Sequence, residues 1–309
     1  MSLLVVGSAA LDTLETPFGK AEDALGGSAV YFSVASSALT DVRLVAVVGE
    51  DFPTEHIETL AGRPIDLTGL ERAEGCTFRW SGRYGFDLNQ AITLDTQLNV
   101  FEKFDPQLPE SYADSEFVFL ANIHPSLQLK VLEQVPEAEF TGADTMNFWI
   151  EGNRAELEEV FRRVDCVTIN EAEARQFADE PNLYRAIRRI AELGPSYVVI
   201  KRGEYGSLLW HEGEVFFAPA YPLEEVFDPT GAGDSFAGGL FGYLAATGRV
   251  DSLAVRQGVV VGSVLASFNV QDFSLKRLLT VDRVQIAERM ERFRSMTHVE
   301  TTGILTTGG

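Results

Sequence analysis

Short runs of wholly apolar residues recur along this chain and constrain its fold more than any other feature. Such runs suit strands buried on both faces and are too short for buried helices. Between them lie segments whose apolar residues recur with the spacing of a helix. Strands and helices in alternation predict an α/β fold with a doubly wound, mostly parallel sheet flanked by helices. The runs are residues 3–6, 44–48, 117–120, 166–169 and 197–200, and the expected helices are about 28–39, 126–134, 153–161, 171–177, 184–192, 235–247, 252–267 and 281–294.

One segment, residues 76–104, breaks this alternation. Phe78, Trp80 and Tyr84 alternate with polar residues, which is the period of two expected for antiparallel strands with one covered face. A small β appendage on an α/β body suits a lid over a site. A plain surface hairpin would have the same pattern, so both interpretations stay open at this point.

The chain is strongly acidic. Its 309 residues include 46 Asp and Glu against 25 Lys and Arg, which gives a formal net charge of −21. Such a surface repels phosphate backbones and anionic lipids, so we expect neither nucleic acid nor a membrane as a partner. The sequence has neither a basic, signal-like start nor a long apolar stretch, which favours a cytoplasmic protein. Its two cysteines and four histidines lack the spacing of a structural zinc site.

A glycine-containing turn carries the strongest chemical signal. It reads Asp-Pro-Thr-Gly-Ala-Gly-Asp-Ser-Phe from Asp228, and an apolar helix follows. Two glycines allow a tight turn, and the backbone N–H groups of Gly231, Ala232 and Gly233 would point out of the helix N-terminus, where they can bind phosphate. Asp234 could accept the proton of an attacking hydroxyl, or it could simply cap the helix. Neither a Walker A sequence nor a dinucleotide fingerprint occurs in the chain.

This turn resembles the C-terminal signature of the ribokinase-like carbohydrate kinases, the PfkB family. Four more segments resemble motifs of that family, in the family's order. They are Gly26-Gly27, residues 48–52 (Val-Gly-Glu-Asp-Phe), residues 170–173 (Asn-Glu-Ala-Glu) and residues 201–206 (Lys-Arg-Gly-Glu-Tyr-Gly). The resemblance spans roughly residues 1–275 and implies a ribokinase-like fold with a small β-strand lid, whose strands we expect within about 12–27 and 70–105.

The resemblance also implies a role for each matching position. Asp234 would be the catalytic base, and the amides of residues 231–233 would form the anion hole for the transferred phosphoryl group. Glu173 would organise Mg²⁺ through water, and Asp228 matches a position that lines a monovalent-cation site in relatives, which makes K⁺ a candidate cofactor. The substrate side would comprise Asp12, Gly26, Gly27, Ser28 and Tyr31. The nucleotide side would comprise Asn170, Glu173, Lys201, Gly203, Gly206 and Thr230.

Several of these positions also have a purely structural interpretation. Asn170 and Glu173 have the spacing of a capping box, and Asp12 could cap a turn. Lys201 could be a solvated charge at the end of a strand. Ser28 and Tyr31 stand where ribokinase-type sequences usually have lysine and asparagine, which weakens the case for ribose and leaves nucleosides, inositols and hexoses open.

Together the motifs predict an ATP-dependent kinase that phosphorylates a hydroxyl of a sugar or nucleoside. Residues 1–309 would form one ribokinase-like domain that ends in a loose tail at residues 301–309. Lids in this family often pair, so we expect a homodimer through the lid, with Phe78, Trp80 and Tyr84 between the copies. The alternative is a non-catalytic sugar or nucleotide sensor on the same fold.

Overall fold

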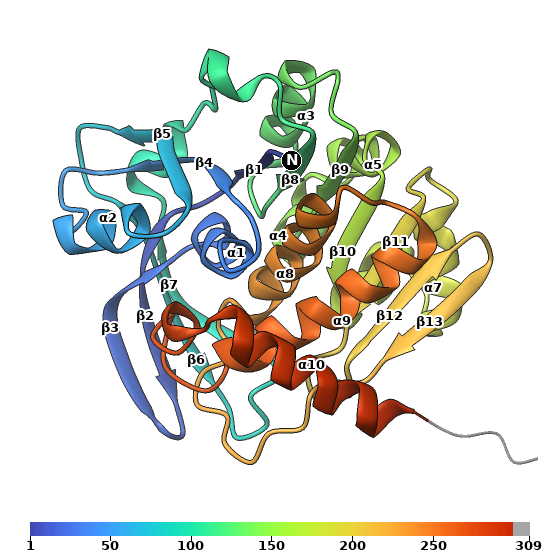
Figure 1. Cartoon of the computed structure of the whole chain (residues 1–309). Helices are drawn as coiled ribbons and strands as arrows, with labels where there is room; N and C mark the ends of the chain where they lie inside the picture. Colours follow the sequence, from blue (N-terminus) through green and yellow to red (C-terminus); the bar gives the residue numbers. More distant parts are fainter. Residues whose placement is uncertain (299–309) are drawn as a thin grey trace, which may run out of the picture.

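A large sheet forms the centre of the computed structural model, which describes residues 1–298 (Figure 1). Its strands are β1 (Leu3–Val6), β4 (Val42–Val48), β5 (Ile65–Arg72), β8 (Phe117–Leu120), β9 (Phe140–Ala143), β10 (Cys166–Asn170), β11 (Tyr197–Lys201), β12 (Ser207–His211) and β13 (Glu214–Ala218). Their order in space is β13-β12-β11-β10-β9-β8-β1-β4-β5. The strands from β5 to β11 pair in parallel, and β12 and β13 pair antiparallel. Each apolar run expected to be a strand is one, which confirms the predicted sheet.

Helices cover both faces of this sheet because the strand residues alternate between two cores. Leu3 and Val5 pack into a core with residues of α1, α8, α9 and α10, whereas Leu4 and Val6 pack into a core with residues of α3, α5, α6 and α7. The helices are α1 (Ser28–Ser36), α2 (Thr54–Ala61), α3 (Pro125–Gln134), α4 (Asn147–Gly152), α5 (Arg154–Arg163), α6 (Glu171–Ala178), α7 (Leu183–Ala191), α8 (Ala232–Thr247), α9 (Ser252–Asn269) and α10 (Arg283–Thr297). Within residues 1–298, no helix combines the length and apolarity needed to cross a membrane. The expected tail at residues 301–309 lies outside the described part.

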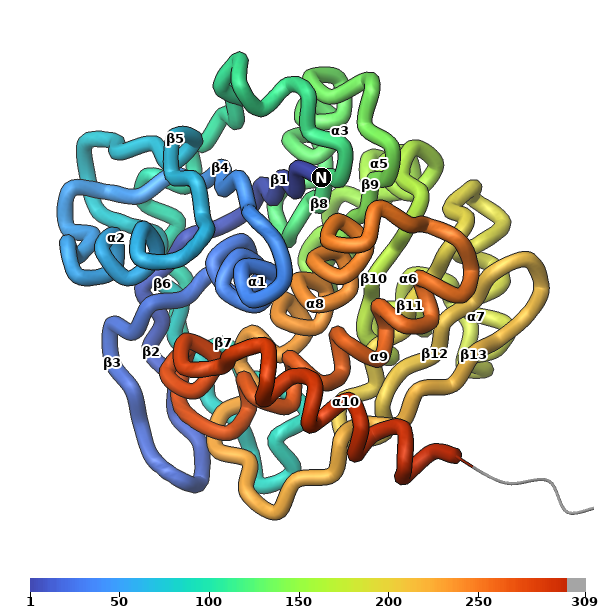
Figure 2. The backbone as a smooth tube through the Cα atoms, in the orientation of Figure 1, coloured from blue at the N-terminus to red at the C-terminus, as the bar shows by residue number. Residues whose placement is uncertain are grey.

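A second, four-stranded sheet fits the predicted lid. It contains β2 (Ala10–Thr16), β3 (Gly19–Gly26), β6 (Phe78–Tyr84) and β7 (Ala91–Gln97), in the order β3-β2-β6-β7. β2 with β3 and β6 with β7 form antiparallel hairpins, and β2 and β6 join them in parallel. Figure 2 traces the chain from β1 into the first hairpin and back into α1. The lid therefore combines two segments that lie far apart in the sequence.

The outer strand of the lid, β7, lacks the buried face that the sequence predicted for this segment. Phe78 on β6 is covered as expected, since its ring stacks on Phe101 with the centroids 5.1 Å apart. Every side chain of β7 is exposed, and Ile92 and Leu94 are 60% and 48% exposed. The prediction of one covered face is therefore wrong for β7. An alternating pattern cannot tell a strand that packs within its own chain from an edge strand without a neighbour.

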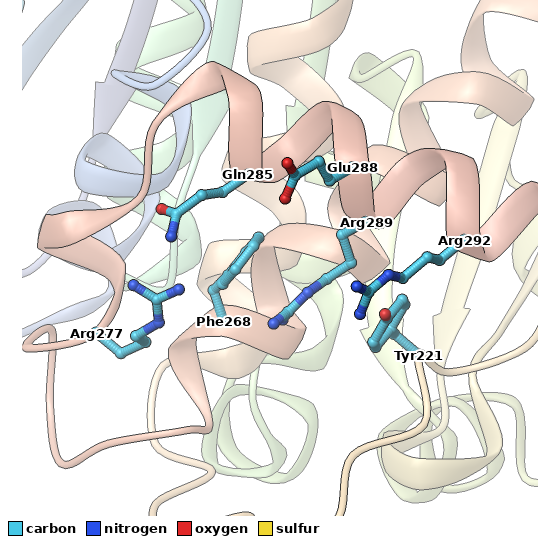
Figure 3. Close-up of a pocket in the computed structure, with 7 residues that line it drawn as sticks. All are labelled: Tyr221, Phe268, Arg277, Gln285, Glu288, Arg289 and Arg292. Carbon is cyan, nitrogen blue, oxygen red and sulfur yellow. The ribbon is translucent and has the colours of Figure 1, made fainter.

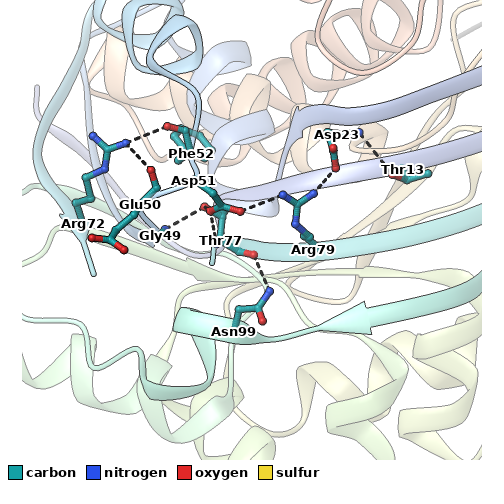
Figure 4. A network of polar contacts seen from close by, with 10 residues as sticks. All are labelled: Thr13, Asp23, Gly49, Glu50, Asp51, Phe52, Arg72, Thr77, Arg79 and Asn99. Carbon is teal, nitrogen blue, oxygen red and sulfur yellow. Dashed lines mark hydrogen bonds and ion pairs between the residues drawn. The ribbon is translucent and has the colours of Figure 1, made fainter. Parts of the chain in front are cut away.

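A polar network ties the base of the lid to the loop after β4 (Figure 4). Asp51 accepts hydrogen bonds from the backbone N–H of Thr77 at 2.6 Å and from the Thr77 hydroxyl at 2.7 Å. Arg79 on β6 pairs with Asp51 at 3.0 Å and also with Asp23 on β3. Burial raises the pKa of Asp51, but the contacts with Thr77 and Arg79 outweigh burial and lower it overall. Residues 48–52 thus hold the lid to the body.

A hollow between α9 and α10 is lined by three arginines, and two of them, Arg277 and Arg289, pack against an aromatic ring (Figure 3). The Phe268 ring lies between Arg277 and Arg289, whose guanidinium carbons are 5.1 and 3.5 Å from its centroid. Arg289 also lies over the Tyr221 ring at 4.8 Å. It donates hydrogen bonds to Ser267 Oγ and Gln271 Oε1 at 2.8 and 2.9 Å. These contacts fasten α10 to α9.

We expect Arg289→Ala to lower the free energy of unfolding by about 1–3 kcal/mol, because it removes two cation–π contacts and two hydrogen bonds that hold α10 to the body. Arg292→Ala is the matched control, because Arg292 is an exposed residue on the same helix. It should change the free energy of unfolding by less than about 0.5 kcal/mol. Urea unfolding followed by circular dichroism measures both values. Equal stabilities of the two variants would contradict this account of the hollow.

Candidate active site

The glycine turn begins α8 and lies beneath an aromatic ring. Gly231 is the N-cap of α8 and has a φ of 72°, a conformation that L side chains rarely adopt. A Cβ atom on Gly231 would lie only 2.2 Å from Cδ1 of Tyr31. The Tyr31 side chain is 1% exposed, so it fills the space above the turn. The position therefore requires glycine both for its backbone and for its contact with Tyr31.

The backbone amides of this turn differ from the expected set in one member. The N–H of Ala232 donates to the carbonyl oxygen of Pro229 at 3.1 Å. Among the described residues, no hydrogen-bond acceptor is paired with the N–H of Gly231 or Gly233. Two of the three expected amides are therefore available to an anion, while that of Ala232 closes the turn.

Asp234, in the first turn of α8, has a strongly perturbed carboxyl group. Burial raises its pKa to about 7, and the nearby carboxylates of Asp144 and Glu173 act in the same direction. The ammonium of Lys201 and the backbone at Asp234 itself act in the opposite direction. Gly231 is the N-cap of this helix, so Asp234 lies inside the first turn and not at the cap position. A carboxyl group that titrates near neutral pH is suited to general-base chemistry.

Asn170 and Glu173 form the capping box that the sequence allowed. The Oδ1 atom of Asn170 accepts from the N–H of Glu173 at 2.9 Å, and Glu173 Oε2 accepts from the N–H of Asn170 at 3.0 Å. Burial raises the pKa of Glu173 to about 7, and Asp144 adds to this effect. Residues 1–298 contain no group of three or more His, Cys, Asp or Glu side chains that could hold a metal. Glu173 Oε1 has no partner among the described residues, so it could contact the water shell of a Mg²⁺ ion that is held mainly by phosphates.

Gly203 and Gly206 shape the loop that follows β11. Both have positive φ, 55° and 85°, and a Cβ atom on Gly206 would lie 2.1 Å from the carbonyl oxygen of Ala218. The loop between β6 and β7 reaches this turn, where Asn89 Nδ2 donates to Glu204 Oε1 at 3.3 Å. The tip of the lid therefore contacts the turn that the sequence assigns to the nucleotide.

Asp12, on β2, lies against the Gly26-Gly27 pair. A Cβ atom on Gly26 would be 2.0 Å from Asp12 Oδ2, so the carboxyl group needs glycine there. Burial raises the pKa of Asp12 to about 8, and Asp228 and Asp234 add to this effect while a hydrogen bond from the Gly27 backbone opposes it. Burial therefore favours the protonated form of Asp12, which can donate a hydrogen bond to a hydroxyl group.

The other three expected substrate positions are held inside the protein. Gly27 is the N-cap of α1 with a φ of 100°, and its Cβ position would be 2.4 Å from the carbonyl oxygen of Ser8. The hydroxyl of Ser28 lies 3.0 Å from Ser8 Oγ. The hydroxyl of Tyr31 is buried without a hydrogen-bond partner among the described residues. Of the three, Tyr31 alone has an unsatisfied polar atom that a ligand could use.

Asp228 is fully buried behind the turn. Its Oδ1 accepts from the N–H of Thr230 and its Oδ2 from the N–H of Ser274, both at 2.9 Å. Asn269 Nδ2 donates to the carbonyl oxygen of Thr230 at 2.7 Å, while Asn269 Oδ1 is buried without a partner among the described residues. A carboxylate, a carbonyl and an unpaired amide oxygen are hard oxygen donors, so this set fits a monovalent cation such as K⁺.

Tyr84 is the main site residue that the sequence interpretation missed. It lies at the end of lid strand β6, and its hydroxyl is 3.2 Å from Thr230 Oγ1 in the glycine turn. Burial raises the pKa of Tyr84, and Asp228, Asp12 and Asp234 are the charged groups around it. In the sequence, Tyr84 is marked only by the alternation of aromatic and polar residues along this strand, which suggested an aromatic surface for dimer formation. The hydroxyl of Tyr84 therefore lies at the glycine turn, whereas the sequence suggested this residue as a dimer contact.

Comparisons with known proteins agree with this architecture. Residues 15–277 match the pfkB family of carbohydrate kinases. A cytidine kinase of Thermococcus kodakarensis is 33% identical over 268 residues, which cover 84% of this chain and 94% of that protein. A nucleoside kinase of Burkholderia thailandensis, solved with inosine, has a TM-score of 0.79 at 19% identity, covering 97% of this chain and 100% of the other. A putative ribokinase II of E. coli, solved with ATP and Mg²⁺, has a TM-score of 0.78 at 18% identity, covering 94% of this chain and 99% of the other. The chain therefore belongs to the pfkB family of carbohydrate kinases.

Proposed function

We propose that this protein is an ATP-dependent kinase that phosphorylates a hydroxyl group of a nucleoside, with Asp234 as the catalytic base. The observation that supports this proposal most strongly is the position of Asp234. It lies in the first turn of α8, next to the unpaired amides of Gly231 and Gly233, with a pKa raised to about 7. A base and an anion-binding turn at the same helix start are what phosphoryl transfer to an alcohol requires.

In the proposed reaction, Asp234 takes the proton as the substrate oxygen attacks the γ-phosphorus of ATP and the bond to the β-γ bridging oxygen breaks. The N–H groups of Gly231 and Gly233 donate to the phosphoryl oxygens at the positive end of α8. Asn170, Glu173, Lys201, Gly203, Gly206 and Thr230 would line the nucleotide side. Glu173 would contact the water shell of Mg²⁺, which would neutralise charge on the phosphates. A K⁺ ion near Asp228 would stabilise the conformation of the turn.

A nucleoside is favoured over a free sugar by two features. The cytidine kinase of T. kodakarensis is 33% identical to this chain and is covered over 94% of its length. Tyr31 and Tyr84 bring two aromatic rings to the glycine turn, and Tyr31 stands where ribokinase-type sequences usually have asparagine. The Asp12 carboxyl, whose pKa burial raises, can hydrogen-bond to a ribose hydroxyl, with Gly26, Gly27 and Ser28 beside it. We therefore place the sugar hydroxyls at Asp12 and the phosphorylated hydroxyl at Asp234.

The substrate proposal is tested by a coupled ADP-release assay with Mg-ATP over nucleosides, pentoses, hexoses and inositols. We expect turnover with a nucleoside, cytidine first among them, and lower kcat/KM for the free sugars. The alternative, a non-catalytic sensor on the same fold, predicts ligand binding without ADP release. The presence of Asp234 and both unpaired amides supports the enzyme over the sensor. Turnover only with a hexose or an inositol would overturn the proposal of a nucleoside substrate, but the proposed kinase activity would still stand.

We also propose that residues 1–309 act as one kinase domain whose lid pairs with the lid of a second copy. β7 is the outer strand of the lid sheet, so its free backbone edge can add another strand. Ile92 and Leu94 are exposed on one face of that strand. These residues replace the aromatic strip that the sequence suggested as the contact.

We expect Ile92→Glu together with Leu94→Glu to halve the molar mass in solution, because charges on both residues oppose burial of the edge. The wild type should have twice the 34.0 kDa of one chain. Phe217→Glu is the matched control, because Phe217 is 66% exposed on β13, the edge strand of the large sheet. Light scattering after size exclusion measures the mass. A wild type that runs as a monomer at all concentrations would contradict the lid dimer.

A further inference from the structure

Asp144 and Lys201 form a buried ion pair beside the proposed transfer site. Asp144 directly follows β9, and Lys201 is the last residue of β11. The Nζ atom of Lys201 lies 2.5 Å from Oδ2 of Asp144, and the two side chains are 15% and 5% exposed. β10 runs between these strands, and its last residue, Asn170, is paired in register with Lys201. The ion pair therefore crosses the carboxyl edge of the sheet, where Asn170 begins the nucleotide side.

The ammonium of Lys201 faces the glycine turn. A Cβ atom on Gly233 would lie 3.1 Å from Lys201 Nζ, so the charge lies directly against the backbone of the turn. An ammonium has three N–H donors, and among the described residues only Asp144 accepts from this one. The next cation along the chain, Arg202, points elsewhere, with its Nε 2.7 Å from Glu171 Oε2. Lys201 thus brings unused donors to the place where the phosphoryl group would pass.

We propose that Asp144 is a positioning residue that holds the Lys201 ammonium over the turn of residues 231–233, where Lys201 binds the phosphoryl group during transfer. This inference rests on the proposed kinase function and adds a residue to its machinery. Without Asp144, the ammonium can turn to the carboxylates of Glu173 or Asp234, which also attract it. In both positions it would leave the phosphoryl path, and beside Asp234 it would oppose proton uptake by the base.

The charges around Asp234 predict that the loss of Asp144 changes the pH profile of kcat, which the loss of a purely structural residue would not do. Asp234 is surrounded by Asp144 after β9, Glu173 on α6 and Lys201 on β11. Asp144 raises the pKa of Asp234, and Lys201 lowers it. Removing the negative charge of Asp144 should therefore lower the pKa of Asp234, and the acid limb of the kcat profile should move to lower pH. The rate and the pH profile would then change together.

The test uses the full chain with Asp144→Asn, Lys201→Gln and the double variant. We expect Asp144→Asn to lower kcat by about 10–100-fold with little change in the KM of the nucleoside, because the lost contact acts on the phosphoryl group. The double variant should resemble Lys201→Gln, since both changes act through the same ammonium. Lys201→Gln should also weaken the affinity for a non-hydrolysable ATP analogue, measured by calorimetry. If Asp144→Asn folds poorly, Lys201→Arg keeps the charge and should retain that affinity while losing kcat.

Asp165→Asn is the matched control. Asp165 precedes β10 at the other end of the same strands, and its Oδ2 accepts from the N–H and the hydroxyl of Thr141 at 2.8 and 2.9 Å. This change should leave kcat and its pH profile as in the wild type. Equal behaviour of Asp144→Asn and Asp165→Asn, with Asp234→Asn inactive, would overturn the positioning role alone. An active Asp234→Asn variant would overturn the proposed base instead, so the two failures are distinguishable.

Discussion

Asp234→Asn should lower kcat by about 10²–10⁴-fold, because the amide cannot accept the proton of the attacking hydroxyl. The change keeps the size and shape of the side chain, so the fold and the dissociation constant of an ATP analogue should stay as in the wild type. The wild-type kcat should rise as the pH increases through about 7, because Asp234 works only after it loses its proton. Steady-state assays between pH 5 and 9 measure both effects.

Asp251→Asn serves as the matched control for this prediction. Asp251 is the N-cap of α9, the helix that follows α8, and its Oδ1 accepts from the N–H of Ala254 at 3.1 Å. Asparagine caps a helix as well as aspartate does, so its kcat and pH profile should match the wild type. An Asp234→Asn enzyme that keeps wild-type kcat would show that another group takes the proton.

Gly231→Ala should produce the second large effect, because the new methyl group meets both a strained backbone and a ring. The φ of 72° strains any L side chain, and the added Cβ would lie 2.2 Å from Cδ1 of Tyr31. Either the turn or Tyr31 must move, which displaces the amides that would bind the phosphoryl group. We expect kcat to fall by about 10²–10³-fold, the size of the loss when an oxyanion contact is removed.

Gly213→Ala is the matched control, because it introduces backbone strain without a steric clash of the added methyl group. Gly213 has a φ of 86° in the turn between β12 and β13, and its added Cβ would meet nothing within 4 Å. It should lose about 1 kcal/mol of stability from backbone strain alone and keep the wild-type kcat. Thermal unfolding and steady-state kinetics compare the two variants. A Gly231→Ala enzyme as active as Gly213→Ala would remove the glycine turn from the proposed mechanism.

The central sheet could be predicted because a strand that is buried on both faces requires a continuous run of apolar residues, which is visible in the sequence. Leu3 to Val6 face two different cores in turn, so all four residues must be apolar. The start of α8 was less predictable. The helix begins at Ala232, three residues before the expected 235, because Gly231 caps it within the glycine turn. The free edge of β7 could not be predicted, since its exposure depends on which strand lies beside it.

The site was predictable where it consists of contiguous residues and unpredictable where the chain folds back on itself. The turn of residues 228–234 and the capping box at Asn170 are local, and the structure contains both, although the Ala232 amide closes the turn. Tyr84 and Asn89 reach the site through contacts across 146 and 115 positions of sequence. The Asp144–Lys201 pair spans 57 positions. No spacing pattern within a short window could have revealed these contacts.

Phosphorus NMR of the reaction mixture tests the central claim most directly. With the wild type, Mg-ATP and cytidine, the account predicts that a phosphomonoester resonance and ADP appear in equal amounts. With Asp234→Asn under the same conditions, neither should accumulate, although the variant still binds the ATP analogue. Saturation of the wild type with nucleosides, without any phosphomonoester in the product, would contradict the claim that this chain is a nucleoside kinase.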